Sequence, residues 1–264
     1  MVKSRILTAA ALLIVLLGQS SGASDNQLPH LRLCSAVQPA SASKAKQGER
    51  IELAWAKLYT WGKGSTLNIC FVGGSPKVQE GVKSAASGWL NYANIHFNYL
   101  GDCGNSASSI RLKSQIRIGF DQQTGSWSYI GTLAKSVSMD KTTMNFGWLE
   151  DGTETSEYHR VVLHEFGHAL GCIHEHQSPN ANIQWNREKV IEYYRLTNGW
   201  DEAETARNIF DQDSSTPIDA SKFDKFSIME YYFPPDLTKN NIVLPLNTEL
   251  SDMDKDLIAN LYPS

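Results

Sequence analysis

The feature that most constrains this chain is the stretch HEFGHALGCIHEH, from His164 to His176, which holds four of the seven histidines among 264 residues. His164 and His168 are four residues apart, a spacing that puts both imidazoles on one face of a helix, within reach of one metal ion. Gly171 tolerates a positive φ, so the helix can stop there and His174 can return to the same ion. In a continued helix His174 would lie roughly 240° around the axis from His168, off the ligand face.

This pattern is typical of a zinc hydrolase site. Such a site uses three protein ligands and keeps one position for water, and we assign the ligands of Zn²⁺ to His164, His168 and His174. His176 is the rival for the third position. Glu165 lies one step around the helix, beside the ion but off the ligand face. Because zinc lowers the pKa of a coordinated water to about 7 and a nearby carboxylate takes its proton, we predict that Glu165 is the general base, with a structural glutamate in an inactive zinc protein as the alternative.

Residues 1–23 have the layout of a secretory signal peptide. Lys3 and Arg5 precede the uncharged run ILTAAALLIVLL, and small residues follow up to Ala23. A membrane anchor is the rival interpretation, but crossing a bilayer takes roughly 20 apolar residues. We therefore expect cleavage after Ala23 and a secreted, extracellular protein with no membrane attachment after cleavage.

The rest of the chain divides into a leader and one domain. Residues 24–50 are polar and without clear periodicity, which predicts a flexible leader or short pro-segment. Ordered structure is expected from about Ile51, and 51–264 is the predicted catalytic domain. The net charge of −4 gives no basic excess, which argues against nucleic acid as a partner. We expect a monomer.

Four cysteines, Cys34, Cys70, Cys103 and Cys172, occur in this secreted chain. An even number predicts two disulfides, and four cysteines allow three connectivities, which the sequence cannot distinguish. Cys172 is either a disulfide partner, a buried thiol or a zinc thiolate. Cys34 is either a disulfide partner or a thiolate that blocks the zinc.

The hydrophobic pattern predicts an α+β fold. A first helix should begin at the cap residue Ser75 with Pro76 in its first turn, and a second should be capped by Thr155 or Ser156. A composition shift after Gly171 predicts two subdomains with a cleft between them. The expected strands cover 67–72, 95–100, 116–120, 126–131 and 142–147, and the expected helices cover 76–90, 156–170, 186–195, 201–208 and a short segment after the capping box Ser251/Asp254.

Three segments together resemble one family. HEFGHALGCIHE resembles the extended zinc signature of the metzincin metallopeptidases, and Glu175 directly after the third histidine is similar to the astacin branch. FDKFSIMEY (Phe223–Tyr231) resembles the astacin Met-turn, and GSWSYIG (Gly125–Gly131) resembles the strand that precedes the zinc helix. The resemblance covers about Ile51 to Pro263.

The resemblance implies a fold and an activity. The fold is a metzincin-like catalytic domain, with a mixed five-stranded sheet and two long helices in the N-terminal subdomain and a mostly helical or irregular C-terminal subdomain. The activity is that of a secreted zinc-dependent endopeptidase, in which an extended peptide pairs with an edge strand of the sheet. The alternatives are a catalytically silent, zinc-stabilised secreted binding protein and a secreted zinc amidase with a non-protein substrate.

The resemblance also implies roles for further residues. Met229 would form an apolar base beneath the zinc. Tyr231 would be a switch tyrosine that ligates zinc at rest and then stabilises the transition-state oxyanion, with a core aromatic as the alternative and Tyr232 as the adjacent competitor. Asp224 would orient a ligand or the turn, and Glu175 would receive the mature N-terminus.

The chain departs from the astacin pattern at several points. Ser126 stands where astacins often have a cysteine, so their disulfide pattern is not carried over. Glu230 replaces the usual Met-turn histidine, which affects local pH behaviour. No astacin pro-segment aspartate motif occurs between Ser24 and Arg50, so the resemblance does not explain how latency is imposed.

Overall fold

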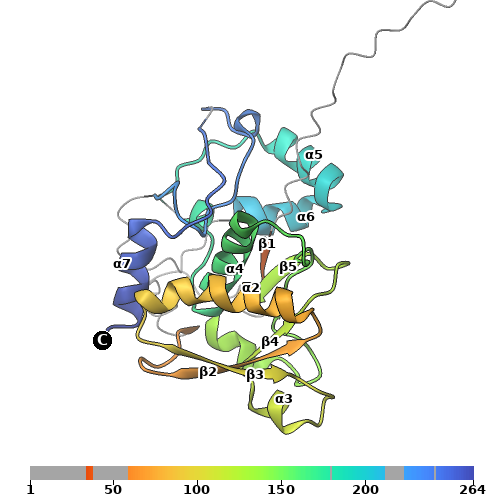
Figure 1. The fold of residues 1–264 in the computed structure, drawn as a ribbon. Helices are drawn as coiled ribbons and strands as arrows, with labels where there is room; N and C mark the ends of the chain where they lie inside the picture. The colour runs from red at the N-terminus through yellow and green to blue at the C-terminus, as the bar shows by residue number, and fades with distance from the viewer. Residues whose placement is uncertain (1–33, 38–58, 179, 212–222, 241) are drawn as a thin grey trace, which may run out of the picture. The chain divides into compact units, whose positions relative to one another are not determined.

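One mixed sheet carries the strands that the sequence predicted. The computed structural model describes residues 34–37, 59–178, 180–211, 223–240 and 242–264, and within these the strands lie in the order β1-β5-β6-β4-β2-β3 (Figure 1). The sheet is parallel from β6 through β4 and β2 to β3, whereas β5 pairs antiparallel with β6. The strand bounds are β1 (Cys34–Val37), β2 (Thr66–Val72), β3 (His96–Asp102), β4 (Ile116–Gly119), β5 (Ser126–Tyr129) and β6 (Met144–Asn145).

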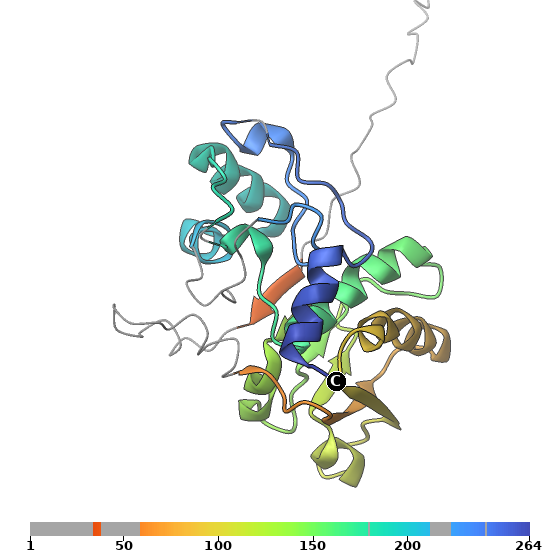
Figure 2. The ribbon, with the colours of Figure 1, turned by 90° about the vertical axis from the view of Figure 1, so that its left-hand side faces the viewer.

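Strand β1 was not predicted. It comes from the leader, which we expected to be flexible, and it pairs in parallel with β5, Cys34 opposite Ser126 and Val37 opposite Tyr129 (Figure 2). The prediction that order begins near Ile51 is therefore wrong for these four residues. The outer edge of β5 presents backbone donors and acceptors with which the leader strand can pair. The predicted signal peptide and its cleavage site lie outside the described residues.

Six α-helices occur in the described residues, and the two long ones predicted in the N-terminal half are among them. Ser75 caps the first of these, since its Oγ accepts a hydrogen bond from Val78 N at 3.1 Å. The cap predicted for the second is wrong, because the helix begins one residue earlier, after Glu154, whose side chain makes no capping bond. The bounds are α2 (Pro76–Ala86), α3 (Ser109–Lys113), α4 (Thr155–Ala169), α5 (Arg187–Asn198), α6 (Glu202–Thr205) and α7 (Asp252–Leu261).

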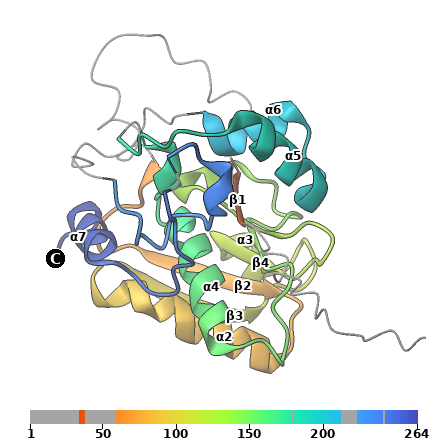
Figure 3. The same ribbon diagram turned by 90° about the horizontal axis from the view of Figure 1, so that it is seen from above.

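Helix α4 carries the zinc motif and is buried along its second half. It packs beside α2 (Figure 3), and every residue of 161–170 is buried. Three side chains from other parts of the chain donate hydrogen bonds to its carbonyl oxygens: Trp89 to Leu163 at 2.9 Å, Trp61 to Ala169 at 2.8 Å, and Tyr262 to Leu170 at 2.6 Å. The carbonyls of Ala169 and Leu170 lie at the end of the helix, where carbonyls lack intrahelical donors. Together the three bonds fix α4 in position.

The C-terminal half is helical and irregular, as predicted. Helices α5 and α6 lie on one side of α4, and strands β2 and β3 lie on the other (Figure 1). Helix α5 ends at Gly199, whose φ of 71° favours glycine, and the predicted capping box of Ser251 and Asp254 begins α7. The segment from Leu31 to Ser264 forms one compact unit. None of the helices in the described parts of the chain is both long and apolar enough to span a lipid bilayer.

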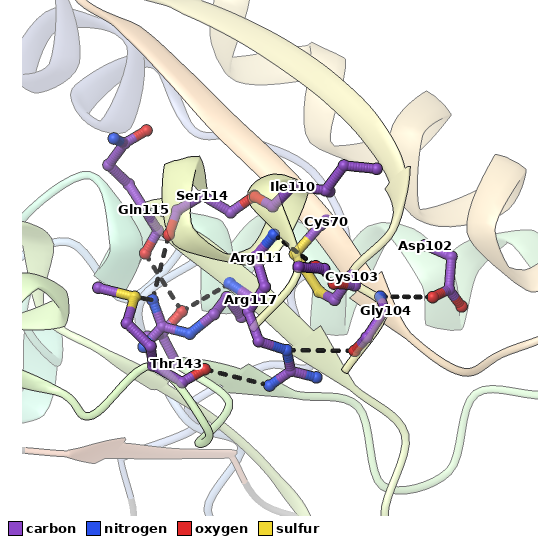
Figure 4. Close-up of a disulfide and its surroundings, with 12 residues drawn as sticks. Cys70, Asp102, Cys103, Gly104, Ile110, Arg111, Ser114, Gln115, Arg117 and Thr143 are labelled. Atoms are coloured by element: carbon purple, nitrogen blue, oxygen red, sulfur yellow. Dashed lines mark hydrogen bonds between the residues drawn. A yellow bond between two sulfur atoms is a disulfide. The ribbon is translucent and has the colours of Figure 1, made fainter. Parts of the chain in front are cut away.

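The disulfide prediction is half wrong. Cys70 and Cys103 form a disulfide that joins β2 to the end of β3 (Figure 4). Cys172 is a buried free thiol, so the chain does not form two internal disulfides. The side chain of Cys34 lies outside the described residues.

Two arginines, Arg111 and Arg117, lie beside the disulfide (Figure 4). They hold the segment 137–141. The buried guanidinium of Arg117 donates to the carbonyl oxygens of Lys141 at 2.7 Å and Val137 at 3.2 Å. Arg111 donates to those of Met139 and Asp140, both at 3.2 Å. Because this segment leads into β6, the two arginines help to fix the part of the sheet next to β5.

Candidate metal centre and active site

Three histidines meet at the end of α4. His164 and His168 lie on the helix, and His174 returns after a turn at Gly171, whose φ is 104°. One ring nitrogen from each lies within 4.8 Å of the other two, and all three residues are buried. Among the described residues this is the group of side chains that could hold a metal ion.

The hydrogen bonds of the three rings fix their tautomers. Nδ1 of His164 lies 2.8 Å from Ile228 O, and Nδ1 of His168 lies 2.9 Å from Cys172 O. Nδ1 of His174 lies 3.3 Å from Gln177 Oε1. Because oxygens of this kind only accept, each Nδ1 carries the hydrogen, and the lone pair is on Nε2.

Those lone pairs face one another. Nε2 of His168 and Nε2 of His174 are 3.1 Å apart, and Nε2 of His164 has no hydrogen-bond partner in the described part of the chain. Burial lowers the pKa of His168 to about 4 and, with the charge of the neighbouring histidines, lowers the pKa of His164 and His174 well below the usual range. Three neutral, buried imidazoles with converging lone pairs repel each other unless a cation lies between them, and a set of three nitrogen donors suits zinc.

The rival ligands lie outside this group. His176 donates from Nε2 to Asn208 O at 2.9 Å, and its Nδ1 lies 3.4 Å from Glu230 Oε1. Cys172 is not part of the group, and burial raises the pKa of its thiol above the usual range. Of the alternatives for Cys172, the buried thiol is confirmed.

Glu165 and Tyr231 lie beside the histidines. Glu165 follows His164 on α4 and is fully buried. The ring of Tyr231 has its centroid 4.3 Å from that of His174 and 5.6 Å from that of His164. Within the described residues, the ring contacts of the three histidines include Tyr231 and not Tyr232.

The turn around Met229 packs against α4. The Met229 side chain occupies the place where a Cβ on Gly167 would stand, and Met229 O accepts from Glu175 N at 3.1 Å. Asp224 N donates to Glu175 Oε1 at 2.8 Å, which ties the start of the turn to the residue after the third histidine. The turn also presents Ile228 O to His164.

Comparison with known proteins identifies the family. The chain matches the model of the peptidase family described as Astacin over residues 59–263. It belongs to the astacin family. Zinc is the metal of this family's peptidases, so the three histidines have the donor set that the family's cofactor needs.

Individual relatives agree with this assignment. The chain is 40% identical to a solved structure of myroilysin, with a TM-score of 0.71 over 79% of this chain and 98% of that one. A second myroilysin crystal structure is 39% identical, with a TM-score of 0.63 over 88% and 91% of the two chains. The hatching enzyme HCE-1, a zinc-protease from the medaka Oryzias latipes, is 18% identical with a TM-score of 0.53 over 79% and 96%, and supports the fold alone.

A larger relative shares only this domain. Meprin A subunit alpha of Rattus norvegicus is 23% identical over a match of 201 residues, and the match covers 68% of this chain and 23% of the relative. The chain therefore spans about a quarter of that relative's length. The predicted astacin resemblance and α+β metzincin fold are confirmed, and residues 59–263 form an astacin-type zinc metalloendopeptidase domain.

Two residues that support this astacin site were missed by the sequence analysis. Gln177 contacts His174 through its side chain. Asp254, predicted only as part of a capping box, also accepts from Ser227 Oγ at 2.6 Å and Ile228 N at 2.8 Å, so it holds the turn whose carbonyl orients His164. The capping pattern indicated Asp254 as a helix cap but not its contacts with the turn. No local sequence pattern indicates the contact between Gln177 and His174.

Proposed function

We propose that this protein is a secreted endopeptidase that hydrolyses peptide bonds in protein or peptide substrates, with zinc held by His164, His168 and His174. The observation that carries the proposal is the convergence of three Nε2 lone pairs whose opposite ring nitrogens are already engaged. The buried, neutral rings keep those lone pairs available well below neutral pH.

Glu165 is the proposed general base. Zinc, when bound, lowers the pKa of a water and polarises the scissile carbonyl. Glu165 takes the proton of the attacking water and then gives it to the departing amine, so one carboxylate serves both halves of the reaction. Its position directly after His164 on a buried helix supports this role, because the side chain has little freedom to leave the site.

Tyr231 is the proposed second catalytic residue. Its ring lies against those of His174 and His164, and Tyr231 N donates to Glu230 Oε1 at 2.8 Å, which fixes the backbone at this point. A phenol next to the metal site can donate a hydrogen bond to the oxyanion that develops on the substrate carbonyl.

Strand β5 is the proposed binding edge for an extended substrate. Its inner edge pairs with β6, and its outer edge pairs with β1 of the leader. A peptide that adds to the sheet by strand addition needs that outer edge, so β1 and substrate compete for it. Displacement or removal of the leader would precede turnover, and we propose residues 24–50 as a pro-segment that follows a cleaved signal peptide.

The test compares three changes at the motif. Glu165→Gln keeps the three histidines and removes the base, so proteolysis of casein should be lost while zinc content, measured by elemental analysis, stays at one ion per chain. His174→Ala should lower the zinc content, whereas His176→Ala should retain the ion. Retained proteolysis by Glu165→Gln would remove the assigned base. A folded, zinc-loaded protein that lacks residues 24–50 and cleaves no peptide would favour the silent binding protein or the amidase.

A further inference from the structure

The third histidine is oriented differently from the other two. Nδ1 of His164 and Nδ1 of His168 each donate to a backbone carbonyl oxygen, those of Ile228 and Cys172. Nδ1 of His174 donates to a side chain, that of Gln177. The direction of the His174 lone pair therefore depends on what holds Gln177.

Gln177 is held by a turn in the C-terminal half. Its Nε2 donates to Arg207 O at 3.0 Å and to Asp211 O at 3.2 Å. Carbonyl oxygens only accept, so the amide nitrogen must face them and the amide oxygen must face His174. The side-chain amide is thus fixed in the one orientation that accepts from Nδ1 of His174.

The turn that anchors Gln177 is π-helical. It covers Ala206–Phe210, directly after α6, and Asp211 N donates to Ala206 O at 2.9 Å. Carbonyls at the end of a helix lack intrahelical donors. Here two side chains from the segment after the third histidine supply the missing donors. Gln177 donates to Arg207 O, and His176 donates from Nε2 to Asn208 O at 2.9 Å.

A second set of contacts keeps the turn in place without Gln177. Asn208 Nδ2 donates to Glu204 O at 2.9 Å, and the capping box of Asp201 and Glu204 begins α6. Ile209 is buried in the core. The turn is therefore a fixed element on which Gln177 rests.

We propose that Gln177 is a positioning residue for the third zinc ligand, coupling His174 to the π-helical turn Ala206–Phe210. The proposal rests on the proposed function only for the assignment of His174 as a ligand. While Gln177 accepts from Nδ1, the hydrogen stays on that nitrogen and the lone pair of Nε2 stays among the other histidines. Without Gln177 the ring can rotate or change tautomer. Partners of this kind typically change metal affinity about 10- to 100-fold.

The first experiment measures zinc affinity in Gln177→Met, which keeps the length of the side chain and removes the amide. Competition with a chromophoric chelator at neutral pH should give a zinc Kd raised about 10-fold or more. Gln79→Met is the matched control, because Gln79 Nε2 also donates to two carbonyl oxygens, Gly73 O at 3.1 Å and Gly74 O at 3.2 Å, without contact to the histidines. Its zinc Kd should stay within about twofold of that of the wild type.

The second experiment measures hydrogen exchange with and without zinc. Because coupling between two sites is reciprocal, zinc should slow amide exchange in the peptide that covers residues 205–211 of the wild type. In Gln177→Met that zinc-induced slowing should be absent. A peptide from α7 reports any general stabilisation by the metal.

Each result bears on the proposal directly. A zinc Kd unchanged in folded Gln177→Met overturns it, and so does equal zinc-induced protection of residues 205–211 in wild type and variant. If the variant fails to fold, the wild-type exchange experiment still decides, because no effect of zinc on that turn overturns the coupling. If the wild type binds zinc and shows the coupling, but the protein without residues 24–50 cleaves no peptide, the proposed function alone is contradicted.

Discussion

The side chain of Met229 lies against Gly167 on α4 and occupies the position that a Cβ at residue 167 would take. The same Cβ would also come within 3.1 Å of Trp89 Cζ2. Gly167 lies between Glu165 and His168 on the zinc helix, so the absence of a side chain there lets the Met-turn approach the metal site. The glycine in HEFGH is thus required by packing and not by backbone conformation.

We therefore expect Gly167→Ala to destabilise the protein. Overpacking of a filled core costs about 1–3 kcal/mol, and the better helix propensity of alanine offsets up to about 1 kcal/mol of this. The free energy of unfolding in urea should fall by about 1–2 kcal/mol. Gly152→Ala is the control, because its Cβ would meet nothing within 4 Å. A Gly167→Ala variant as stable as the Gly152→Ala control would show that Met229 yields to the added methyl group.

The sequence predicted this site well where the pattern was local. The spacing of His164, His168 and Gly171 fixed a helix, its end and a returning third histidine, and all three expectations hold. Ser75 and Ser251 were found as caps because capping depends on residues three positions apart. Each of these features involves only neighbouring parts of the chain.

The sequence failed where a contact joined distant segments. Gln177 acquires its role from carbonyls 30 and 34 residues later, which no local pattern can indicate. Arg117 is fully buried although arginine usually predicts an exposed side chain, because the carbonyls of 137–141 surround it. Strand β1 is only four residues long and exists through its pairing with β5.

Removal of the Tyr231 hydroxyl should slow turnover without loss of the metal. Loss of one donor to a developing oxyanion typically costs about 10²- to 10³-fold in kcat, so Tyr231→Phe should lower kcat by about 10²-fold or more and change KM little. Tyr232→Phe, at the adjacent position that makes no ring contact with the three histidines in the described residues, is the comparison. Steady-state kinetics on a quenched fluorescent peptide measures both. If Tyr232→Phe were the slow variant, the assignment of the two tyrosines would be reversed.

Disruption of the leader strand should activate the enzyme. In a parallel pair every second N–H of β1 faces β5, so prolines at both Ser35 and Ala36 remove at least one hydrogen bond whichever residue donates. We expect kcat/KM of Ser35→Pro/Ala36→Pro to exceed that of the leader-bearing wild type by about 10-fold or more. The reason is that a weakened β1 competes less well with the substrate for the outer edge of β5. A synthetic peptide of residues 24–50 should inhibit the enzyme that lacks them, and the double-proline peptide should not. Equal inhibition by the two peptides would mean that the leader acts elsewhere than at β5.

The metal-free protein should lose stability in acid through its buried histidines. Burial lowers the pKa of His168 to about 4 from an ordinary value near 6.5. Between these values the unfolded chain binds a proton that the folded chain does not, so the free energy of unfolding falls as pH falls from about 6.5 to about 4. For His168 alone the loss is on the order of 3 kcal/mol. Burial raises the pKa of Glu175 to about 7 from an ordinary value of 4.5, so between these values Glu175 has the opposite effect, and its contribution to the free energy of unfolding rises as pH falls.

The contribution of His168 is isolated by His168→Asn, whose amide can replace Nδ1 as donor to Cys172 O and does not titrate. Urea unfolding of both chelator-treated proteins should give a difference in stability, wild type minus variant, that shrinks by on the order of 3 kcal/mol from pH 7 to pH 4. Glu175 is present in both proteins and cancels in this difference. A difference that stays constant with pH would mean that His168 takes up its proton in the folded state as readily as in the unfolded state, and that the three lone pairs are not held in the neutral, converging arrangement on which zinc binding depends.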